Sequence, residues 1–142
     1  MQIKEITYGT AEYQSLLNFR YLYLRKPLGL NWSHDDLLDE SKQIHLGLIN
    51  NKKIIGCCVL KILNSNTLKI RQMAIDKKYQ KMGYGKKLIQ YAENYAATKN
   101  YKKIIITARM GALDFYLRYG YQTEGKKFTD VTLASIKLIK DL

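Results

Sequence analysis

The sequence predicts an α/β protein built on a mixed, mostly antiparallel central sheet of six to seven strands with helices on both faces. Three β-rich runs follow one another between residues 44 and 75, separated by short turns, and the apolar period then becomes helical. The 142 residues, 46% of them hydrophobic, suit one core, and no Gly/Ser-rich or low-complexity stretch offers a linker. We therefore expect a single domain over residues 1–142.

The N-terminal part predicts a strand followed by two helices. Residues 2–7 alternate weakly and favour a strand, whereas residues 11–25 place apolar and aromatic side chains at helical spacing. Pro27 breaks this helix. Ser33 followed by Asp36 imitates a capping box, which predicts a second, brief helix.

The middle of the chain predicts an antiparallel meander. The runs at 44–49 and 54–63 are joined by Asn50-Asn51, a pair that tolerates the left-handed backbone of a tight hairpin. A third run, TLKIRQMAI at 67–75, follows a further Asn-rich turn. These three runs supply the centre of the predicted sheet.

The C-terminal half predicts alternating helices and strands. Apolar residues from Gly85 onward recur at helical spacing and mark a helix that ends near Lys99-Asn100. The nearly all-apolar run at 102–108 is typical of a strand buried on both faces. A second apolar stripe through residues 112–119 predicts another helix, which Gly120 caps, and the remaining residues predict one or two strands.

Basic residues dominate the composition, with 24 Lys and Arg against 12 Asp and Glu, for a net charge of +12. Such an excess attracts anions such as nucleotide phosphates, nucleic acid or an acidic surface, but a compositionally biased genome would also produce it. No run approaches the roughly 18 apolar residues of a membrane span, and the first residues lack the apolar run of a signal peptide. We therefore expect a cytoplasmic protein.

Metal and disulfide chemistry have little support in the sequence. Cys57 and Cys58 are adjacent within an apolar strand, so they point to opposite faces and are interpreted as small buried hydrophobes. With His34 and His45 as the two histidines, a His-rich metal site is excluded, and no ligand spacing is visible elsewhere. We predict no metal site.

Residues 80–85, QKMGYG, connect the end of a predicted strand to the start of a predicted helix. Backbone N–H groups and the positive end of the helix dipole meet at such a junction, so an anion is favoured there. The dinucleotide fingerprint would need Gly at position 88, where Leu88 stands, and a P-loop would need Gly at the position of Gln80. Taken alone, the two glycines also suit an ordinary strand-to-helix turn.

Two signatures together resemble the GNAT superfamily of N-acetyltransferases. The family's loop runs Gln/Arg-x-x-Gly-x-Gly/Ala, and Gln80, Gly83 and Gly85 match it in place. About 30 residues later, Ala112 to Tyr121 is similar to the family's second signature, Ala-x-x-Phe-Tyr-x-x-x-Gly-Phe/Tyr. The order of elements agrees as well, so the resemblance covers essentially the whole chain and implies a GNAT fold.

The resemblance implies acetyl-coenzyme A as co-substrate and assigns residues to it. The backbone of Met73, Ala74 and Ile75 would bind the pantetheine arm as an added strand, and an amide at or near Ile75 would polarise the thioester carbonyl. Tyr116 occupies the position of the general acid that protonates the thiolate, although a core aromatic would fit the same apolar stripe. Many relatives carry an Asn that contacts the coenzyme where this chain has Arg109. The pyrophosphate would lie on the loop Gln80, Lys81, Met82, Gly83, Tyr84, Gly85 and Lys86.

The general base is left open by the sequence. A related subgroup closes with a His that is missing here, so His45, Asp130 and a water molecule all stay candidates. Asp35, Asp36, Asp39 and Glu40 form an acidic cluster that could bind a polyamine, but their spacing more simply decorates a helix N-terminus.

The function favoured by these patterns is acetyl transfer from acetyl-coenzyme A to a primary amine of a small-molecule or protein acceptor. The alternative is a non-catalytic acyl-coenzyme A-binding or sensor domain on the same fold. A nucleic-acid-binding module ranks third, because the aromatic residues follow core stripes rather than a basic surface run. No membrane partner is expected, and homodimer formation is left open.

Overall fold

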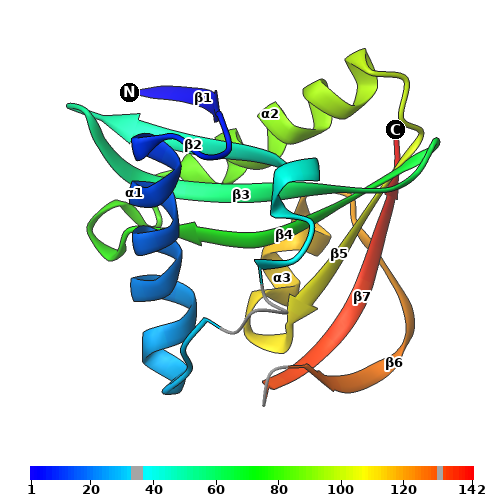
Figure 1. The fold of residues 1–142 in the computed structure, drawn as a ribbon. Helices are drawn as coiled ribbons and strands as arrows, with labels where there is room; N and C mark the ends of the chain where they lie inside the picture. Colours follow the sequence, from blue (N-terminus) through cyan, green and yellow to red (C-terminus); the bar gives the residue numbers. More distant parts are fainter. Residues whose placement is uncertain (33–36, 131–132) are drawn as a thin grey trace.

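The computed structural model describes residues 1–32, 37–130 and 133–142 and organises them around one seven-stranded sheet (Figure 1). The strand order is β1-β2-β3-β4-β5-β7-β6, and every neighbouring pair is antiparallel except β4 and β5, which are parallel. The predicted mixed, mostly antiparallel sheet with helices on both faces is confirmed.

The bounds of the elements follow the predicted order. The strands and helices are β1 (Gln2–Ile6), α1 (Ala11–Arg20), β2 (Ile44–Asn50), β3 (Lys53–Asn64), β4 (Thr67–Ile75), α2 (Tyr84–Thr98), β5 (Lys103–Arg109), α3 (Leu113–Arg118), β6 (Gln122–Asp130) and β7 (Leu133–Asp141). Short helical turns add a π-helical segment, Tyr21–Arg25, and single 3₁₀ turns at Lys26–Leu28, Glu40–Lys42, Lys77–Tyr79 and Met110–Ala112.

Three local details differ from the pattern-based expectation. The first helix is α-helical only to Arg20 and continues as the π-helical turn. Asn50 pairs with Lys53, so the hairpin tip is Asn51-Lys52, and both tip residues have positive φ angles. The capping box predicted at Ser33 and Asp36 lies outside the described residues.

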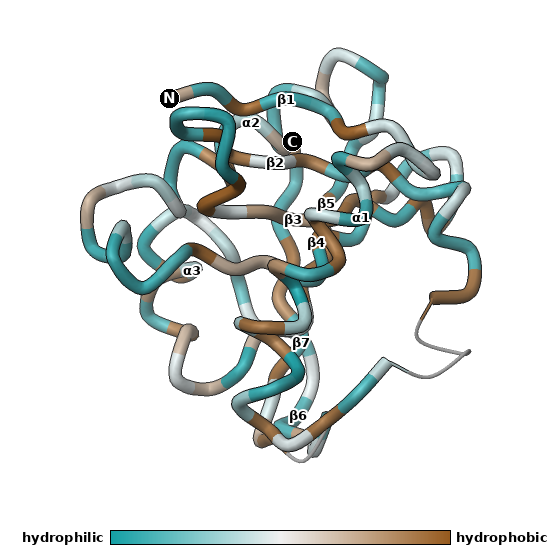
Figure 2. The backbone as a smooth tube through the Cα atoms, turned by 60° about the vertical axis from the view of Figure 1, so that its left-hand side comes forward, coloured by the Kyte–Doolittle hydropathy of each residue, from teal (hydrophilic) through white to brown (hydrophobic). Residues whose placement is uncertain are grey.

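Two hydrophobic clusters lie on opposite faces of the sheet. Helices α2 and α3 pack on one face over the larger cluster, which includes Cys58, while α1 packs on the other face over a cluster that includes Cys57 (Figure 1). Both cysteine side chains are fully buried, as their opposite strand faces predict. Hydrophobic segments run through the central strands in Figure 2, and hydrophilic ones mark most turns.

Strand β5 is buried on one face only, which corrects the prediction of burial on both. Ile104, Ile106 and Ala108 are buried in the α2 and α3 cluster, whereas the residues between them are half-buried. The reason is that the α1 cluster reaches β1 to β4 but not β5. This uncovered face of β5 borders the candidate site.

Strands β4 and β5 part halfway along their length. They are paired from Thr67 with Lys103 to Ile70 with Ile106, and beyond this point β5 continues to pair only with β7. A bulge in β4 accompanies the separation, because the register against β3 shifts between Cys57 and Val59 and Gln72 has a φ of 51°. The second half of β4 therefore keeps backbone groups that β5 does not pair.

Candidate functional site

A groove runs along the open half of β4 and the loop that follows it. This loop groove has a volume of about 770 Å³ and is bounded on its far side by α3. Nine of the residues predicted to bind the coenzyme line it: Met73, Ala74, Ile75, Gln80, Lys81, Gly83, Gly85, Lys86 and Tyr116. Met82 and Tyr84 belong to the same loop but do not line the groove, and Met82 is mostly exposed.

The loop holds an open helix N-terminus against the groove. Gly83 is the N-cap residue of α2, and no side chain among the described residues caps this end of the helix. The first N–H groups of α2 therefore need an outside acceptor, and the helix dipole favours an anionic one. The side chain of Gln80 braces the loop, because its Nε2 donates a hydrogen bond to the Ile75 carbonyl oxygen at 2.9 Å.

The two glycines of the loop are needed for different reasons. Gly83 has a φ of 88°, in the left-handed region that favours glycine, but nothing in the described part of the chain lies within 4 Å of where a Cβ would be. At Gly85 a Cβ would lie 3.3 Å from the ring of Phe115 and 3.5 Å from the methyl of Met73. Gly83 thus sets the backbone turn, and Gly85 lets α2 approach α3 and β4.

Tyr116 lies at the inner end of the loop groove. Its side chain is 8% exposed, and its hydroxyl lies 3.7 Å from the Met73 sulfur. Burial raises the pKa of Tyr116 to about 12. The phenol therefore stays protonated at neutral pH and can donate a hydrogen bond to a group that enters the groove.

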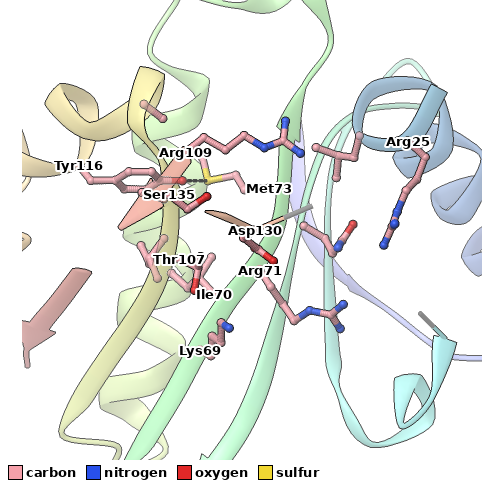
Figure 3. Close-up of a pocket in the computed structure, with 15 residues that line it drawn as sticks. Arg25, Lys69, Ile70, Arg71, Met73, Thr107, Arg109, Tyr116, Asp130 and Ser135 are labelled. Atoms are coloured by element: carbon pink, nitrogen blue, oxygen red, sulfur yellow. Dashed lines mark hydrogen bonds between the residues drawn. The ribbon is translucent and has the colours of Figure 1, made fainter. Parts of the chain in front are cut away.

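A second cavity of about 400 Å³ lies beside the groove, over the uncovered face of β5. This basic cavity is lined by four cationic side chains, Arg25, Lys69, Arg71 and Arg109, and by one acidic side chain, Asp130 (Figure 3). Arg109, which was predicted to contact the coenzyme, lines this cavity and not the loop groove.

The groove and the cavity meet at a shared wall. Met73 and Tyr116 line both, together with Leu24 and Ala112. A molecule in the groove and a second molecule in the cavity would therefore come together beside the Tyr116 hydroxyl. Holding two reactants in contact is the main requirement of a direct group transfer.

The candidate bases fall in different places. Asp130 lines the basic cavity, where a bound acceptor would be within its reach. His45 lines neither cavity; it is 1% exposed, and its Nε2 donates to the Glu40 carbonyl oxygen at 2.8 Å. Burial lowers the pKa of His45. His45 is thus a structural residue and is removed from the candidates.

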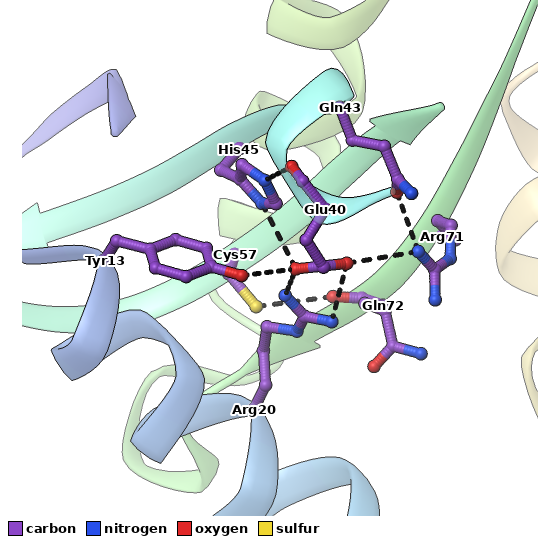
Figure 4. Close-up of polar contacts among 8 residues, drawn as sticks. All are labelled: Tyr13, Arg20, Glu40, Gln43, His45, Cys57, Arg71 and Gln72. Atoms are coloured by element: carbon purple, nitrogen blue, oxygen red, sulfur yellow. Dashed lines mark hydrogen bonds and ion pairs between the residues drawn. The ribbon is translucent and has the colours of Figure 1, made fainter. Parts of the chain in front are cut away.

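Glu40 corrects the interpretation of the acidic cluster. Its carboxylate is 1% exposed instead of decorating a helix surface, and Asp35 and Asp36 lie outside the described residues. Arg20 binds Glu40 with Nη1 to Oε1 at 2.6 Å, the Tyr13 hydroxyl donates to Oε1 at 2.8 Å, and Arg71 Nη1 lies 3.3 Å from Oε2 (Figure 4). The network joins α1 to β4 at the edge of the basic cavity.

The cationic lining was not foreseen from the sequence, although a signal was present. Lys69 and Arg71 lie two residues apart in the run TLKIRQMAI, so the period of a strand places them on one face. Leu68 and Ile70 occupy the other face and are buried under α2. Arg20 was also missed, although a charge four residues after Leu16 in an apolar helical stripe indicates a buried partner.

Comparison with known proteins identifies the family. A family model described as the acetyltransferase (GNAT) family matches residues 10–121, and the chain therefore belongs to that family. None of the described helices is long and apolar enough to cross a membrane. Among the described residues, no group of three or more His, Cys, Asp or Glu side chains is arranged to hold a metal ion.

Solved structures of similar fold cover nearly the whole chain. A GNAT family acetyltransferase from Elizabethkingia anophelis, solved with acetyl-CoA bound, is 25% identical, with a TM-score of 0.74 and coverage of 99% of this chain and 97% of that one. A Lactobacillus plantarum protein is 17% identical, with a TM-score of 0.88 and coverage of 100% and 99%. An aminoglycoside 6'-N-acetyltransferase complexed with coenzyme A is 14% identical, with a TM-score of 0.82 and coverage of 99% and 97%.

Proposed function

We propose that the protein is an N-acetyltransferase that transfers the acetyl group of acetyl-coenzyme A directly to a primary amine of a small-molecule or protein acceptor. The observation that carries the proposal is the meeting of the loop groove and the basic cavity at Met73 and Tyr116. The acetyl-CoA and coenzyme A in the two similar structures support the choice of co-substrate. A cytoplasmic location and a single domain over residues 1–142 stay predictions.

The loop groove fits the coenzyme in shape and charge. The uncapped amides at the start of α2 would bind the pyrophosphate, and Lys81 and Lys86 in the groove wall add positive charge. The backbone of Met73 to Ile75, left unpaired by β5, would hold the pantetheine arm as an added strand. An amide at or near Ile75 would polarise the thioester carbonyl.

The side chains at the junction would donate and accept the protons that move during the acetyl transfer. When bound, acetyl-coenzyme A supplies a thioester; the acceptor nitrogen forms a bond to its carbonyl carbon, and the C–S bond breaks. Tyr116 would donate its hydroxyl proton to the departing thiolate, because its side chain lines the junction where the thioester would lie, and the phenolate left behind would regain a proton from water. The proton that the amine loses would pass to Asp130 or to a water molecule.

The test is release of free thiol from acetyl-coenzyme A in the presence of a panel of primary amines, with mass spectrometry of each amine. The proposal predicts thiol release that depends on the amine and matches the acetylated product one to one. Tight binding of acetyl-coenzyme A without turnover on any amine would instead support the alternative, a non-catalytic sensor.

A further inference from the structure

The basic cavity is unusual for a site that must accept an amine, because its charged lining is mostly cationic. The four cations come from three segments: Arg25 from the π-helical turn, Lys69 and Arg71 from β4, and Arg109 from β5. Figure 3 shows Arg25, Arg71 and Arg109 around the same space from different sides. Asp130 is the one carboxylate among the described lining residues.

Internal partners leave much of this positive charge without compensation. Glu40 accepts from Arg71, but the same carboxylate also binds Arg20 through both guanidinium nitrogens, so one anion serves two cations. Within the described part of the chain, neither Lys69 nor Arg109 has a carboxylate within 4.0 Å.

The surroundings of Lys69 show the same imbalance. Burial is the largest cause that lowers its pKa, and the charges of Arg71, Lys61 and Lys137 lower it further, against Asp130, which raises it. Lys69 is half-buried, whereas Arg109 is exposed. A half-buried cation such as Lys69 gains more from an anionic partner than an exposed one does, because it has lost part of its hydration. Guanidinium groups also match carboxylate and phosphate oxygens in geometry.

We propose that the acceptor is a small-molecule primary amine that also carries an anionic group, a carboxylate or a phosphate, which Lys69, Arg71 and Arg109 bind. This inference rests on the proposed acetyl transfer. Lys69 and Arg71 line the basic cavity but not the loop groove, so the anionic group lies away from the junction. The amine then faces Met73 and Tyr116, where the thioester would be. The volume of about 400 Å³ suits a molecule of small metabolite size.

The acceptor class is tested with matched amines that differ in charge. Glycine and β-alanine are compared with their amides, O-phosphoethanolamine with ethanolamine, and spermidine serves as the cationic case. We expect kcat/KM to be at least about tenfold higher for an anionic amine than for its neutral partner, because a hydrogen bond to a charged group contributes roughly that much. Comparing the carboxylate-bearing amines with the phosphate-bearing amine shows which of the two anionic groups the cavity prefers. Equal or better turnover of the neutral or cationic amines would overturn the inference and leave the acetyl transfer standing.

Substitutions in the basic cavity show which residues bind the anionic group of the acceptor. Lys69→Gln and Arg109→Gln should each raise KM for the preferred anionic amine about tenfold. Each substitution should also reduce the ratio of kcat/KM between the anionic amine and its neutral partner. Lys61→Gln is the matched control, because Lys61 is exposed, pairs with Lys69 across β3 and β4, and does not line the cavity. An unchanged preference in both cavity variants would contradict the assignment. Failure of every amine to release thiol would refute the proposed function itself.

Discussion

At the scale of single residues, Tyr116 packs in the core, and the fold makes this packing compatible with its proposed role as a general acid. Its ring contributes to the α2 and α3 cluster, and it meets the rings of Phe115 and Tyr121 edge-on. Its hydroxyl faces the Met73 sulfur at the junction of groove and cavity. Packing holds the Tyr116 ring in place, and the ring in turn keeps its hydroxyl directed toward the junction of the groove and the cavity.

Replacing this hydroxyl separates the two roles. Tyr116→Phe keeps the packing and should lower kcat by about 10²–10⁴-fold, the usual contribution of a general acid. Melting temperature and acetyl-coenzyme A affinity should change little. Tyr121→Phe is the matched control: its hydroxyl bonds Glu93 at 3.0 Å and lines neither cavity, so it should cost about 1 kcal/mol of stability and leave kcat unchanged. Turnover of Tyr116→Phe within about threefold of wild type, with chemistry rate-limiting, would make Tyr116 a packing residue only.

Glu40 is the residue on which the buried ion network depends. Glu40→Gln would leave Arg20, which is fully buried, without its anion, and should lower the free energy of unfolding by about 3–5 kcal/mol. Asp39→Asn is the control at the neighbouring exposed carboxylate, which lies 3.8 Å from Lys42, and should have almost no effect. Urea unfolding of both variants gives the comparison, and equal stabilities would show that the network contributes nothing.

The same network predicts how stability depends on pH. Burial lowers the pKa of His45 below 6.5. At Glu40, burial raises the pKa, but the hydrogen bond and the charge of Arg20 together outweigh this effect, so the pKa of Glu40 lies below 4.5. In both cases the unfolded chain binds the proton more tightly, so stability is full above the ordinary pKa and is lost as pH falls. The melting temperature should therefore be level between about pH 7 and 8, decline below 6.5 and decline further below 4.5. His45→Gln should remove the decline in melting temperature that begins below pH 6.5. If that decline persists in the variant, it is caused by a group other than His45.

At the scale of elements, the loop and the start of α2 form the proposed pyrophosphate site. Gly83→Asp places a negative charge there without a clash, and Asp is among the residues that best tolerate a positive φ. Acetyl-coenzyme A at 100 times its dissociation constant should stabilise the wild type by about 2.7 kcal/mol, and Gly83→Asp should abolish the shift. Gly83→Asn introduces a side chain of the same shape as Asp but without its charge, so acetyl-coenzyme A should still stabilise this variant. Thermal unfolding with and without ligand measures this, and equal shifts in Asp and Asn variants would contradict the site.

Periodicity predicted most elements because their burial is regular. The stripe from Gly85 marks α2, and β-rich apolar runs mark β2 to β4, since the buried part of each strand has one face or both faces in a core. The bulge at Gln72 carries no such signal, because no glycine or turn residue marks its positive φ. The bulge coincides with the register shift against β3, and the Cys57 thiol donates a hydrogen bond to the Gln72 carbonyl oxygen at 3.3 Å.

The site was predictable only where it depends on local sequence. The resemblance to the family predicted roles for the loop from Gln80 to Lys86 and for Tyr116, and that resemblance rests on one strand-to-helix junction and one helix. Burial of Glu40 depends on Arg20, 20 residues away, and on Arg71, 31 residues away, so no local pattern contains it. The basic cavity likewise collects residues from separate segments, which only the folded sheet brings together.

At the scale of the whole molecule, the net charge of +12 gains a local explanation. Part of the excess lines the groove, through Lys81 and Lys86, and part lines the basic cavity. Both are concave sites of a size suited to small ligands, and low-dielectric walls strengthen their attraction for anions. The charge therefore fits an anionic coenzyme and an anionic acceptor better than a long polyanion such as nucleic acid.

We propose that the groove and the cavity bind two substrates that meet at Tyr116, and a crystal structure with acetyl-coenzyme A would show whether the coenzyme lies there. We expect the pyrophosphate on the amides of the loop from Gln80 to Gly85 and the pantetheine arm along Met73 to Ile75. We also expect the thioester sulfur within hydrogen-bonding reach of the Tyr116 hydroxyl, with the carbonyl open to the basic cavity. A coenzyme bound outside the groove, or a sulfur beyond the reach of Tyr116, would refute this two-substrate arrangement.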